Sequence, residues 1–314
     1  MANFGESLIM LLPSTTEIQF LSHQILQEKK VELGILRLDK IHNQVSGNKF
    51  FKLKYNLKEA KRLGKKTILT FGGAYSNHIY ATAAAAKLAG LNSIGIIRGD
   101  GFDENNPTLS YGRNQGMNLH FVDREKYRAK TSKQFLEELK GIFGDFYLIP
   151  EGGTNHFAIQ GTKEILTSST HESTHICTSV GTGGTFVGLA TSIRSGQELL
   201  GFSSLKGEFI RDEIQALLKE FEINPQGKIE LITQYHFGGY AKWKPELIEF
   251  LHWFHSEFGI AIDPVYTGKM AYGIWELFKK DYFPPNSKIL MIHTGGLQGN
   301  LGFVQRTGIA IPLG

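Results

Sequence analysis

The chain has 314 residues, of which 41% are hydrophobic and 20% are charged, as in an ordinary globular protein. Its 34 basic and 30 acidic side chains leave a net charge of only +4, and its longest apolar runs are far too short to cross a membrane, so neither a nucleic-acid partner nor a membrane is expected. The single cysteine, Cys177, excludes an internal disulfide, lies in an apolar strand pattern typical of a core, and fits the reducing cytoplasm.

The first part of the chain leads to a lysine-bearing helix. Scattered apolar positions predict a short helix within 15–26, and alternation predicts a strand over 31–38. The turn-forming Ser46-Gly47-Asn48 then precedes a pattern in which apolar residues recur at helical spacing. Asn48 is expected to cap this helix with its side chain, and Gly64 to end it. Lys49 would therefore lie in the first helical turn.

The rest of the chain alternates between strands and helices. Strands are expected at 67–71, 93–97, 118–122, 146–149, 175–180, 199–202, 229–233 and 288–293. Helices are expected at 78–88, from 107 onward, and at 132–143, 157–166, 185–193, 210–221, 245–258 and 269–278. This alternation predicts the α/β class, with open, mostly parallel sheets flanked by helices. Glycine-rich loops follow several strands, at the sheet edge where such folds bind ligands.

Lys49 is the first candidate for chemistry. The positive end of the helix dipole and the neighbouring Lys52 and Lys54 would both disfavour its charged form and lower its pKa. A lysine with a lowered pKa can form a Schiff base with an aldehyde, because only the neutral amine attacks. The alternative is that Lys49 is one more surface lysine.

The loop Gly181-Thr182-Gly183-Gly184-Thr185 joins a strand to a helix and is the best candidate anion site. Its glycines let backbone N–H groups converge on a phosphate, and its threonines add hydroxyl donors. It is not a nucleotide-binding P-loop, because no Gly-Lys-Ser/Thr follows. It is not a dinucleotide fingerprint either, because it lies late in the chain and lacks a suitably placed acid. The alternative is a tight strand-to-helix turn without a ligand.

Four more polar side chains are candidates for the site. Ser76 and Asn77 open an alanine-rich helix, where they could simply cap it or could bind a substrate carboxylate and a cofactor oxygen. Tyr240 and Tyr266 lie in glycine-bounded loops, as half-buried packing residues or as groups for acid–base work. No histidine has a metal-ligand spacing with cysteines or carboxylates, so no catalytic metal is expected.

Several motifs occur together in one order. They are Gly47-Asn48-Lys49 with Lys52-Leu53, Ser76-Asn77-His78, Glu151-Gly152-Gly153-Thr154-Asn155, the loop 181–185, Asp263-Pro264-Val265-Tyr266-Thr267-Gly268-Lys269 and His293-Thr294-Gly295-Gly296. Over residues 30–300 this order resembles the 1-aminocyclopropane-1-carboxylate deaminase and D-cysteine desulfhydrase family. The resemblance implies a two-lobed tryptophan-synthase β-like fold, a pyridoxal 5'-phosphate cofactor, a small amino-acid substrate and a homodimer.

The resemblance also implies roles for the motif residues. Lys49 would hold the cofactor as a Schiff base and later move the substrate α-proton, and Lys52 matches the family's second lysine. Asn77 would contact the phenolic oxygen of the cofactor ring, and Ser76 the substrate carboxylate. The loop 181–185 would bind the cofactor phosphate.

Other positions bear on which reaction is run. Tyr240 and Tyr266 match the family's active-site tyrosines. Family members that open the cyclopropane ring typically carry Glu after the loop tyrosine and Leu after the final histidine, whereas Thr267 and Thr294 stand here. Neutral hydroxyls beside the pyridine nitrogen would weaken the electron sink, which favours β-elimination over ring opening. Tyr80-Ala81 also stand where the family commonly has Arg-Gln.

The resemblance places residues 51–149 in a small lobe, and residues 1–50 with 150–314 in a large cofactor-binding lobe.

The leading hypothesis is a deaminating lyase that converts D-cysteine or a related β-substituted amino acid into a 2-oxo acid, ammonia and sulfide. A 1-aminocyclopropane-1-carboxylate deaminase giving 2-oxobutanoate and ammonia is the alternative within the family. A catalytically idle protein that binds the cofactor or an amino acid is one alternative outside it. Another is a phosphate-binding sugar or nucleotide enzyme, which offers no role for Lys49.

Overall fold

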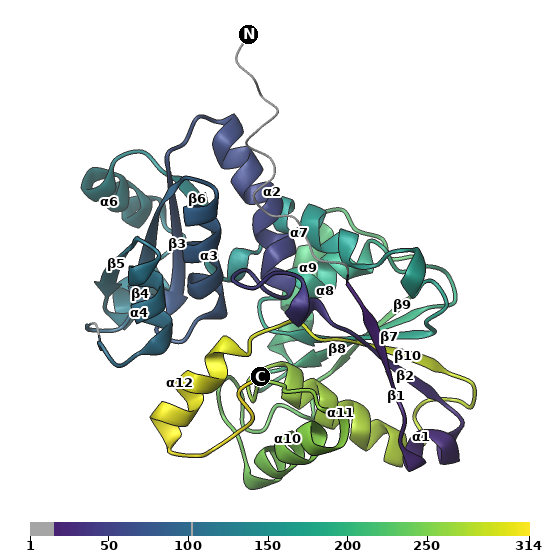
Figure 1. Ribbon diagram of the computed structural model, residues 1–314. Coiled ribbons are helices and arrows are strands. Elements are labelled where there is room, and N and C mark those ends of the chain that lie inside the picture. The colour runs from purple at the N-terminus through teal and green to yellow at the C-terminus, as the bar shows by residue number, and fades with distance from the viewer. Residues whose placement is uncertain (1–15, 102) are drawn as a thin grey trace.

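The structure, a computed structural model, describes residues 16–101 and 103–314, and these form two sheets (Figure 1). The six-stranded sheet has the order β1-β2-β10-β7-β8-β9, and the four-stranded sheet the order β5-β4-β3-β6. Neighbouring strands are parallel in both sheets except at the β1–β2 edge. The predicted α/β class with mostly parallel sheets is therefore confirmed. The strands are β1 (Ile18–Leu21), β2 (Glu32–Leu36), β3 (Thr67–Gly73), β4 (Asn92–Arg98), β5 (Met117–Val122), β6 (Tyr147–Ile149), β7 (His175–Val180), β8 (Glu198–Ser203), β9 (Lys228–Ile232) and β10 (Lys288–Ile292).

Helices follow the strands in the expected order. They are α1 (Gln24–Lys29), α2 (Asn48–Arg62), α3 (Asn77–Leu88), α4 (Pro107–Asn114), α5 (Arg124–Arg128), α6 (Lys133–Phe143), α7 (His156–Thr162), α8 (Gly184–Ala190), α9 (Phe209–Glu220), α10 (Pro245–Phe258), α11 (Thr267–Lys279) and α12 (Gln298–Thr307). Short 3-10 turns lie at Leu38–Lys40, Glu151–Gly153, Lys163–Ile165 and Ser168–Thr170. Within the described part of the chain, no helix is both long and apolar enough to cross a membrane.

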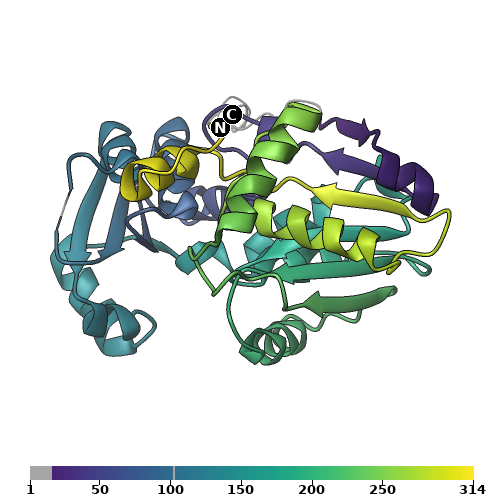
Figure 2. The same cartoon turned by 90° about the horizontal axis from the view of Figure 1, so that it is seen from below.

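Three local predictions differ from the structure. The helix expected within 15–26 is wrong where the chain is described: β1 and then α1 occupy this stretch, because β1 pairs with β2 and satisfies its backbone groups across the sheet. The sequence pattern also predicts neither α5 nor α12. The helix α12 contains two glycines and packs beside α4 of the four-stranded sheet, so tertiary contact supports it more than its own propensity does (Figure 2).

Apolar layers cover both faces of each sheet, as the strand–helix alternation predicts. In the six-stranded sheet, α2, α7, α8 and α9 pack on one face, while α1, α10 and α11 pack on the other. In the four-stranded sheet, α3 and α4 cover one face, while α5 and α6 cover the other. Cys177 is fully buried in the core of the six-stranded sheet, as expected.

The start of α2 is held against the end of β10 by a close backbone contact. Gly47, the N-cap residue, has φ +68°, and the N–H of Asn48 donates to the carbonyl oxygen of Thr294 at 3.3 Å. A Cβ atom at Gly47 would lie only 2.0 Å from that oxygen, so only glycine permits this approach. The contact places Lys49 at the carboxyl edge of the larger sheet.

Replacing Gly47 with Ala should therefore destabilise the protein far more than the same change at Gly64. Both glycines have a left-handed φ (+68° and +66°), but nothing lies within 4 Å of a Cβ atom at Gly64. Gly64→Ala should cost about 1–2 kcal/mol of unfolding free energy. Gly47→Ala should cost about 4 kcal/mol or more, because the Thr294 turn must also move. Thermal and denaturant unfolding measure both, and equal losses would contradict the role given to this contact.

Candidate active site

A cavity of about 460 Å³ lies where loops from both sheets meet the first turn of α2. Segments that follow β3, β6, β7 and β10 contribute to its wall, so it lies at the carboxyl ends of parallel strands, as expected. Of the residues predicted for the site, Gly184 and Thr267 do not line the cavity. The others do: Lys49, Ser76, Asn77, Gly181, Thr182, Gly183, Thr185, Tyr240, Tyr266 and Thr294.

Lys49 extends into this cavity from the first turn of α2. Its amino group donates to Asn48 Oδ1 at 3.2 Å, and Asn48 Nδ2 donates to Thr185 Oγ1 at 2.8 Å. The predicted capping role of Asn48 is wrong, because its side chain turns to the glycine loop and Gly47 is the N-cap residue. Burial lowers the pKa of Lys49 to about 8, and the charge of Asp263 opposes this shift. The lowered pKa is confirmed, with burial rather than the neighbouring lysines as its cause.

Lys52, one turn further along α2, is buried and hydrogen-bonded to the loop that contains Gly152 and Thr154. Its Nζ donates to the Gly152 carbonyl at 2.8 Å and to Thr154 Oγ1 at 3.3 Å, and the Thr154 hydroxyl lies 2.8 Å from that of Thr182. Burial holds the pKa of Lys52 well below its usual value. A Cβ atom at Gly184 would come within 2.7 Å of Thr154 Oγ1 and 3.1 Å of the Lys52 amine, so a larger residue there would disturb both side chains. Lys52 thus ties the glycine loop to α2.

The two predicted tyrosines lie together on one side of the cavity. Their ring centroids are 6.0 Å apart; Tyr266 lies against Gly181, and Tyr240 is exposed at the mouth. Asp263 holds the loop before α11, because its two oxygens accept the backbone N–H groups of residues 265 to 267 at 2.7–2.9 Å. Lys269 Nζ donates at 2.7 Å to the carbonyl that precedes Tyr240. Burial raises the pKa of Tyr266 well above its usual value, so its phenol stays protonated.

Three hydroxyl groups form a cluster on the larger-sheet side of the cavity. Thr294 Oγ1 lies 3.2 Å from Ser179 Oγ and 3.4 Å from Thr267 Oγ1. Thr294 and Ser179 line the cavity, whereas Thr267 is fully buried behind them. The sequence analysis missed Ser179, although this residue is the second-last of β7, two positions before the glycine loop, and could have been found from that position.

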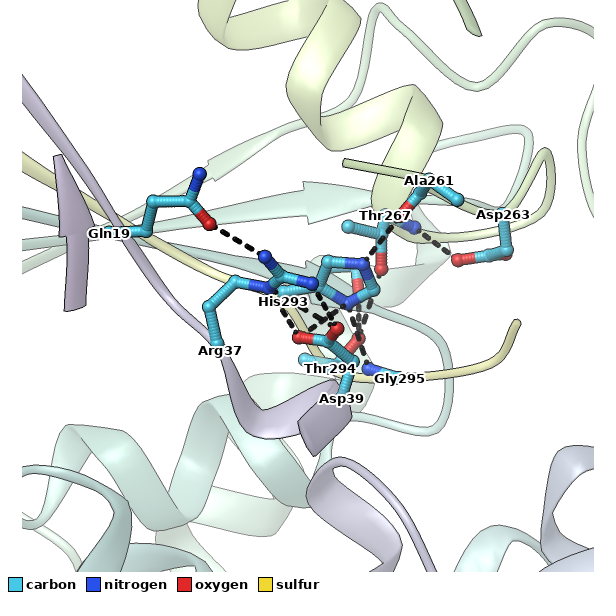
Figure 3. Close-up of polar contacts among 10 residues, drawn as sticks. Gln19, Arg37, Asp39, Ala261, Asp263, Thr267, His293, Thr294 and Gly295 are labelled. Carbon is cyan, nitrogen blue, oxygen red and sulfur yellow. Dashed lines mark hydrogen bonds and ion pairs between the residues drawn. The ribbon is translucent and has the colours of Figure 1, made fainter. Parts of the chain in front are cut away.

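A buried polar network supports the turn that carries Thr294 (Figure 3). His293 Nδ1 accepts the N–H of Gly295 at 3.2 Å, so Nε2 carries the proton and donates to the Ala261 carbonyl at 2.9 Å. Asp39 Oδ1 lies 3.8 Å from Nδ1, and Arg37 donates to both Asp39 oxygens at 2.9 and 2.7 Å. Burial disfavours the Asp39 charge, but hydrogen bonds and nearby positive charge, from Arg37 above all, together outweigh it and lower the pKa of Asp39. The network thus joins β2, β10 and the loop before α11.

Ser76 and Asn77 lie on the smaller-sheet side. Ser76 Oγ accepts the N–H groups of His78 at 3.2 Å and Ile79 at 3.3 Å, so it caps α3 and also borders the cavity. Asn77 Oδ1 accepts a hydrogen bond from Gln298 Nε2 at 2.9 Å. Gln298 opens α12 and lines the cavity, and the sequence analysis missed it because it did not predict this helix.

The residues present fit pyridoxal 5'-phosphate. A lysine with a pKa of about 8 can present a neutral amine to an aldehyde. Backbone N–H groups and threonine hydroxyls of the loop 181–185 border the same cavity and suit a phosphate. An α/β fold that brings such a lysine and such a loop into one cavity defines the class: an enzyme that binds an aldehyde cofactor with a phosphate group.

Comparison with known families completes the identification. The sequence profile of the family described as "Pyridoxal-phosphate dependent enzyme" matches residues 20–295. The chain belongs to this family, and its cofactor is therefore pyridoxal 5'-phosphate.

Individual relatives narrow the family further. A protein of Pyrococcus abyssi described as "Putative 1-aminocyclopropane-1-carboxylate deaminase" is 32% identical over 93% of this chain and 92% of its own length. A mitochondrial protein of Arabidopsis thaliana, described as a bifunctional D-cysteine desulfhydrase/1-aminocyclopropane-1-carboxylate deaminase, is 32% identical over 85% of this chain and 73% of its own length. A crystal structure described as an "ACC deaminase homologue" has a TM-score of 0.81 and 28% identity, and the match covers 94% of each chain. The resemblance seen in the motifs is confirmed.

Covalent uptake of pyridoxal phosphate by the cofactor-free protein should depend on pH through the Lys49 amine. Its rate should rise with pH and level off above about 8, because the amine attacks only when it is neutral. Stopped-flow absorbance measures the rate, and borohydride reduction with peptide mapping locates the bond. Lys49→Ala is the matched control and should take up no label. A midpoint near the ordinary 10.5, or a label on Lys52 or Lys269, would contradict the assignment.

Proposed function

We propose that the enzyme is a deaminating lyase that eliminates the β-substituent of a small amino acid such as D-cysteine, giving a 2-oxo acid, ammonia and sulfide. The observation that carries this proposal is the neutral hydroxyl cluster of Ser179, Thr267 and Thr294. A hydroxyl can share a hydrogen bond with a ring nitrogen, but it does not stabilise a positive charge there as a carboxylate would. β-Elimination tolerates the weaker electron sink, because the substituent leaves as the α-proton is removed. Ring opening needs a stronger sink.

The residues that line the cavity would share the binding of the cofactor. Bound pyridoxal phosphate supplies the electron sink. Lys49 would hold it covalently, which its pKa of about 8 supports. The loop 181–185 would bind the phosphate, with Thr182 and Thr185 adding hydroxyl groups to the backbone donors. Asn77 would contact the phenolic oxygen with its free amide group, since its own carbonyl already accepts from Gln298.

The substrate-binding roles would fall to Ser76, Lys49 and the two tyrosines. Ser76 Oγ accepts two backbone hydrogen bonds and keeps its own proton, which it can donate to the substrate carboxylate. The Lys49 amine, once released from the cofactor, would take the substrate α-proton. Tyr266 stays protonated, so it would position the substrate or give a proton to the leaving thiolate, with Tyr240 beside it at the mouth. Thr294, with Thr267 behind it, would face the ring nitrogen.

Cyclopropane ring opening is the second candidate function. It is favoured by the descriptions of the Pyrococcus and Arabidopsis relatives, which both name 1-aminocyclopropane-1-carboxylate deaminase. The Arabidopsis description also names D-cysteine desulfhydrase, so the two reactions occur together in one relative. The site supports elimination better, for the electrostatic reason given above.

We also propose a wider organisation for the protein. Residues 51–149 would form a small lobe, and residues 1–50 with 150–314 a large lobe; residues 1–15 lie outside the described part of the chain. The four strands β3 to β6 support this division, because they form a sheet of their own. A homodimer is supported by Phe20, an apolar side chain that is 69% exposed on the edge strand β1. A cytoplasmic location fits the one buried, unpaired cysteine.

Two assays on one preparation should separate the two candidate reactions. We expect sulfide and pyruvate from D-cysteine, and little or no 2-oxobutanoate from 1-aminocyclopropane-1-carboxylate, because the hydroxyl cluster leaves the electron sink weak. Colorimetric detection of sulfide and of 2-oxo acids measures both. Efficient formation of 2-oxobutanoate with no sulfide from D-cysteine would overturn the proposed reaction.

Removing the Tyr266 hydroxyl should slow catalysis and leave cofactor binding intact. Tyr266→Phe keeps the ring that packs on Gly181, so the yellow colour of the bound cofactor should persist. The turnover rate should fall by roughly 10²–10⁴-fold if this hydroxyl positions or transfers a proton. Tyr272→Phe is a matched control, since Tyr272 does not line the cavity. Turnover as fast as in the unsubstituted enzyme would reduce Tyr266 to a packing residue.

A further inference from the structure

A second cavity of about 240 Å³ opens beside the first. The two are adjacent, because they share six lining residues: Gly73, Asn77, Arg98, Tyr240, Tyr266 and Gly296. A small neutral side chain such as that of cysteine would leave this second space unfilled. It therefore has room for a larger group carried by the substrate.

Two exposed arginines line the second cavity, both on the side of the smaller sheet. Arg98 ends β4 of the smaller sheet, and Arg306 lies on α12. The guanidinium carbon of Arg98 lies 5.6 Å from the ring centroid of Tyr127. That of Arg306 lies 5.4 Å from the ring centroid of Tyr75. Among the described residues, neither arginine has a carboxylate within ion-pairing distance. Both charges are therefore available to a ligand.

The acidic residues nearby offset these charges only in part, because one carboxylate faces two arginines in the second cavity. Asp263 also lines the second cavity, but both of its oxygens accept backbone N–H groups of its own loop. Glu151 lines only the first cavity; it accepts the Tyr127 hydroxyl at 2.8 Å and pairs with Lys130 at 3.3 Å. The space between the arginines thus favours an anion.

Arg98 also lies close to the proposed carboxylate site. It pairs with Gly73 across the β3–β4 register, and its Nη2 would be 3.6 Å from a Cβ atom at Gly73. Gly73 is three residues before Ser76, which caps α3. A substrate whose carboxylate is held by Ser76 can therefore extend its side chain toward Arg98 and Arg306.

We propose that the substrate is an amino acid whose β-substituent is itself an anion: a sulfonate, a sulfate ester or a phosphate ester. This inference rests on the proposed elimination and names its substrate class. Arg98 and Arg306 would bind the anionic group and stabilise the negative charge that grows on it as the Cβ bond breaks. Such a group leaves without needing a proton, so the weak electron sink of the hydroxyl cluster suffices.

The reaction balances without an oxidant or reductant. For a serine O-sulfate, the Cα–H and Cβ–O bonds break, the α-proton passes to Lys49, and sulfate leaves with the bonding electron pair. The released 2-aminoacrylate takes up water and gives pyruvate and ammonia. No group other than water enters the reaction.

The test compares two substrates in three proteins. Pyruvate release from serine O-sulfate, in both enantiomers, and from D-cysteine is measured with the holoenzyme, with Arg98→Gln and with Arg128→Gln. Arg128 is exposed at the end of α5 and lines neither cavity, so its variant controls for net charge. We expect a higher kcat/KM for one serine O-sulfate enantiomer than for D-cysteine. Arg98→Gln should lower the kcat/KM for serine O-sulfate, relative to that for D-cysteine, roughly 10- to 100-fold, mainly by raising the KM for serine O-sulfate. Arg128→Gln should leave this ratio unchanged.

Inorganic sulfate provides a second readout that does not need turnover of an anionic substrate. It should inhibit D-cysteine turnover competitively, and Arg98→Gln should weaken this inhibition by a similar factor. If D-cysteine is consumed but the ratio and the sulfate inhibition are the same in Arg98→Gln, the anion site is wrong and the elimination stands. If neither substrate releases pyruvate, the proposed reaction itself fails, and this inference fails with it.

Discussion

The site depends on one backbone contact, the approach of Gly47 to the Thr294 carbonyl. It brings two chain segments separated by 246 residues to the same edge of the larger sheet. One segment carries Lys49 in the first turn of α2, and the other carries the hydroxyl of Thr294. The buried pairing of Arg37 with Asp39, next to His293, holds the same junction from behind. Lys49 and Thr294, which both line the cavity, are therefore positioned by the same few atoms.

Three buried or half-buried lysines lie around the cavity, and their partners separate their roles. Lys52 and Lys269 each donate to backbone carbonyls, and so each holds a loop in place. Lys49 has a single hydrogen-bond partner among the described residues, the Asn48 side chain, and this leaves its amine available to an aldehyde. Desolvation then lowers its pKa enough for a neutral amine to form near pH 8. The same burial that disfavours a charged lysine thus increases the fraction of neutral Lys49 amine.

The charges around the substrate are distributed unevenly. The inner wall presents neutral hydroxyls at Ser179 and Thr294, and the carboxylate of Asp263 is fully occupied by its own loop. The outer part carries the positive charges of Arg98 and Arg306. A weak electron sink inside and cations outside suit a reaction in which a good leaving group carries negative charge outward. These features together favour elimination over ring opening.

The sequence alone determined the α/β class, the order of most elements and nearly all of the proposed site, because these are encoded locally. Hydrophobic periodicity marked the strands and helices, and glycine-rich loops marked the carboxyl edge of the sheets. What the sequence left open depends on distant partners. The segment expected to be a helix contains β1, because pairing with β2 outweighs its weak helical pattern. Asn48 turns to Thr185 instead of capping its helix, and Thr267 lies behind Thr294 instead of in the cavity. Gln298 and the two arginines joined the site only through tertiary packing, since it brings together side chains that are far apart in the chain and share no local pattern.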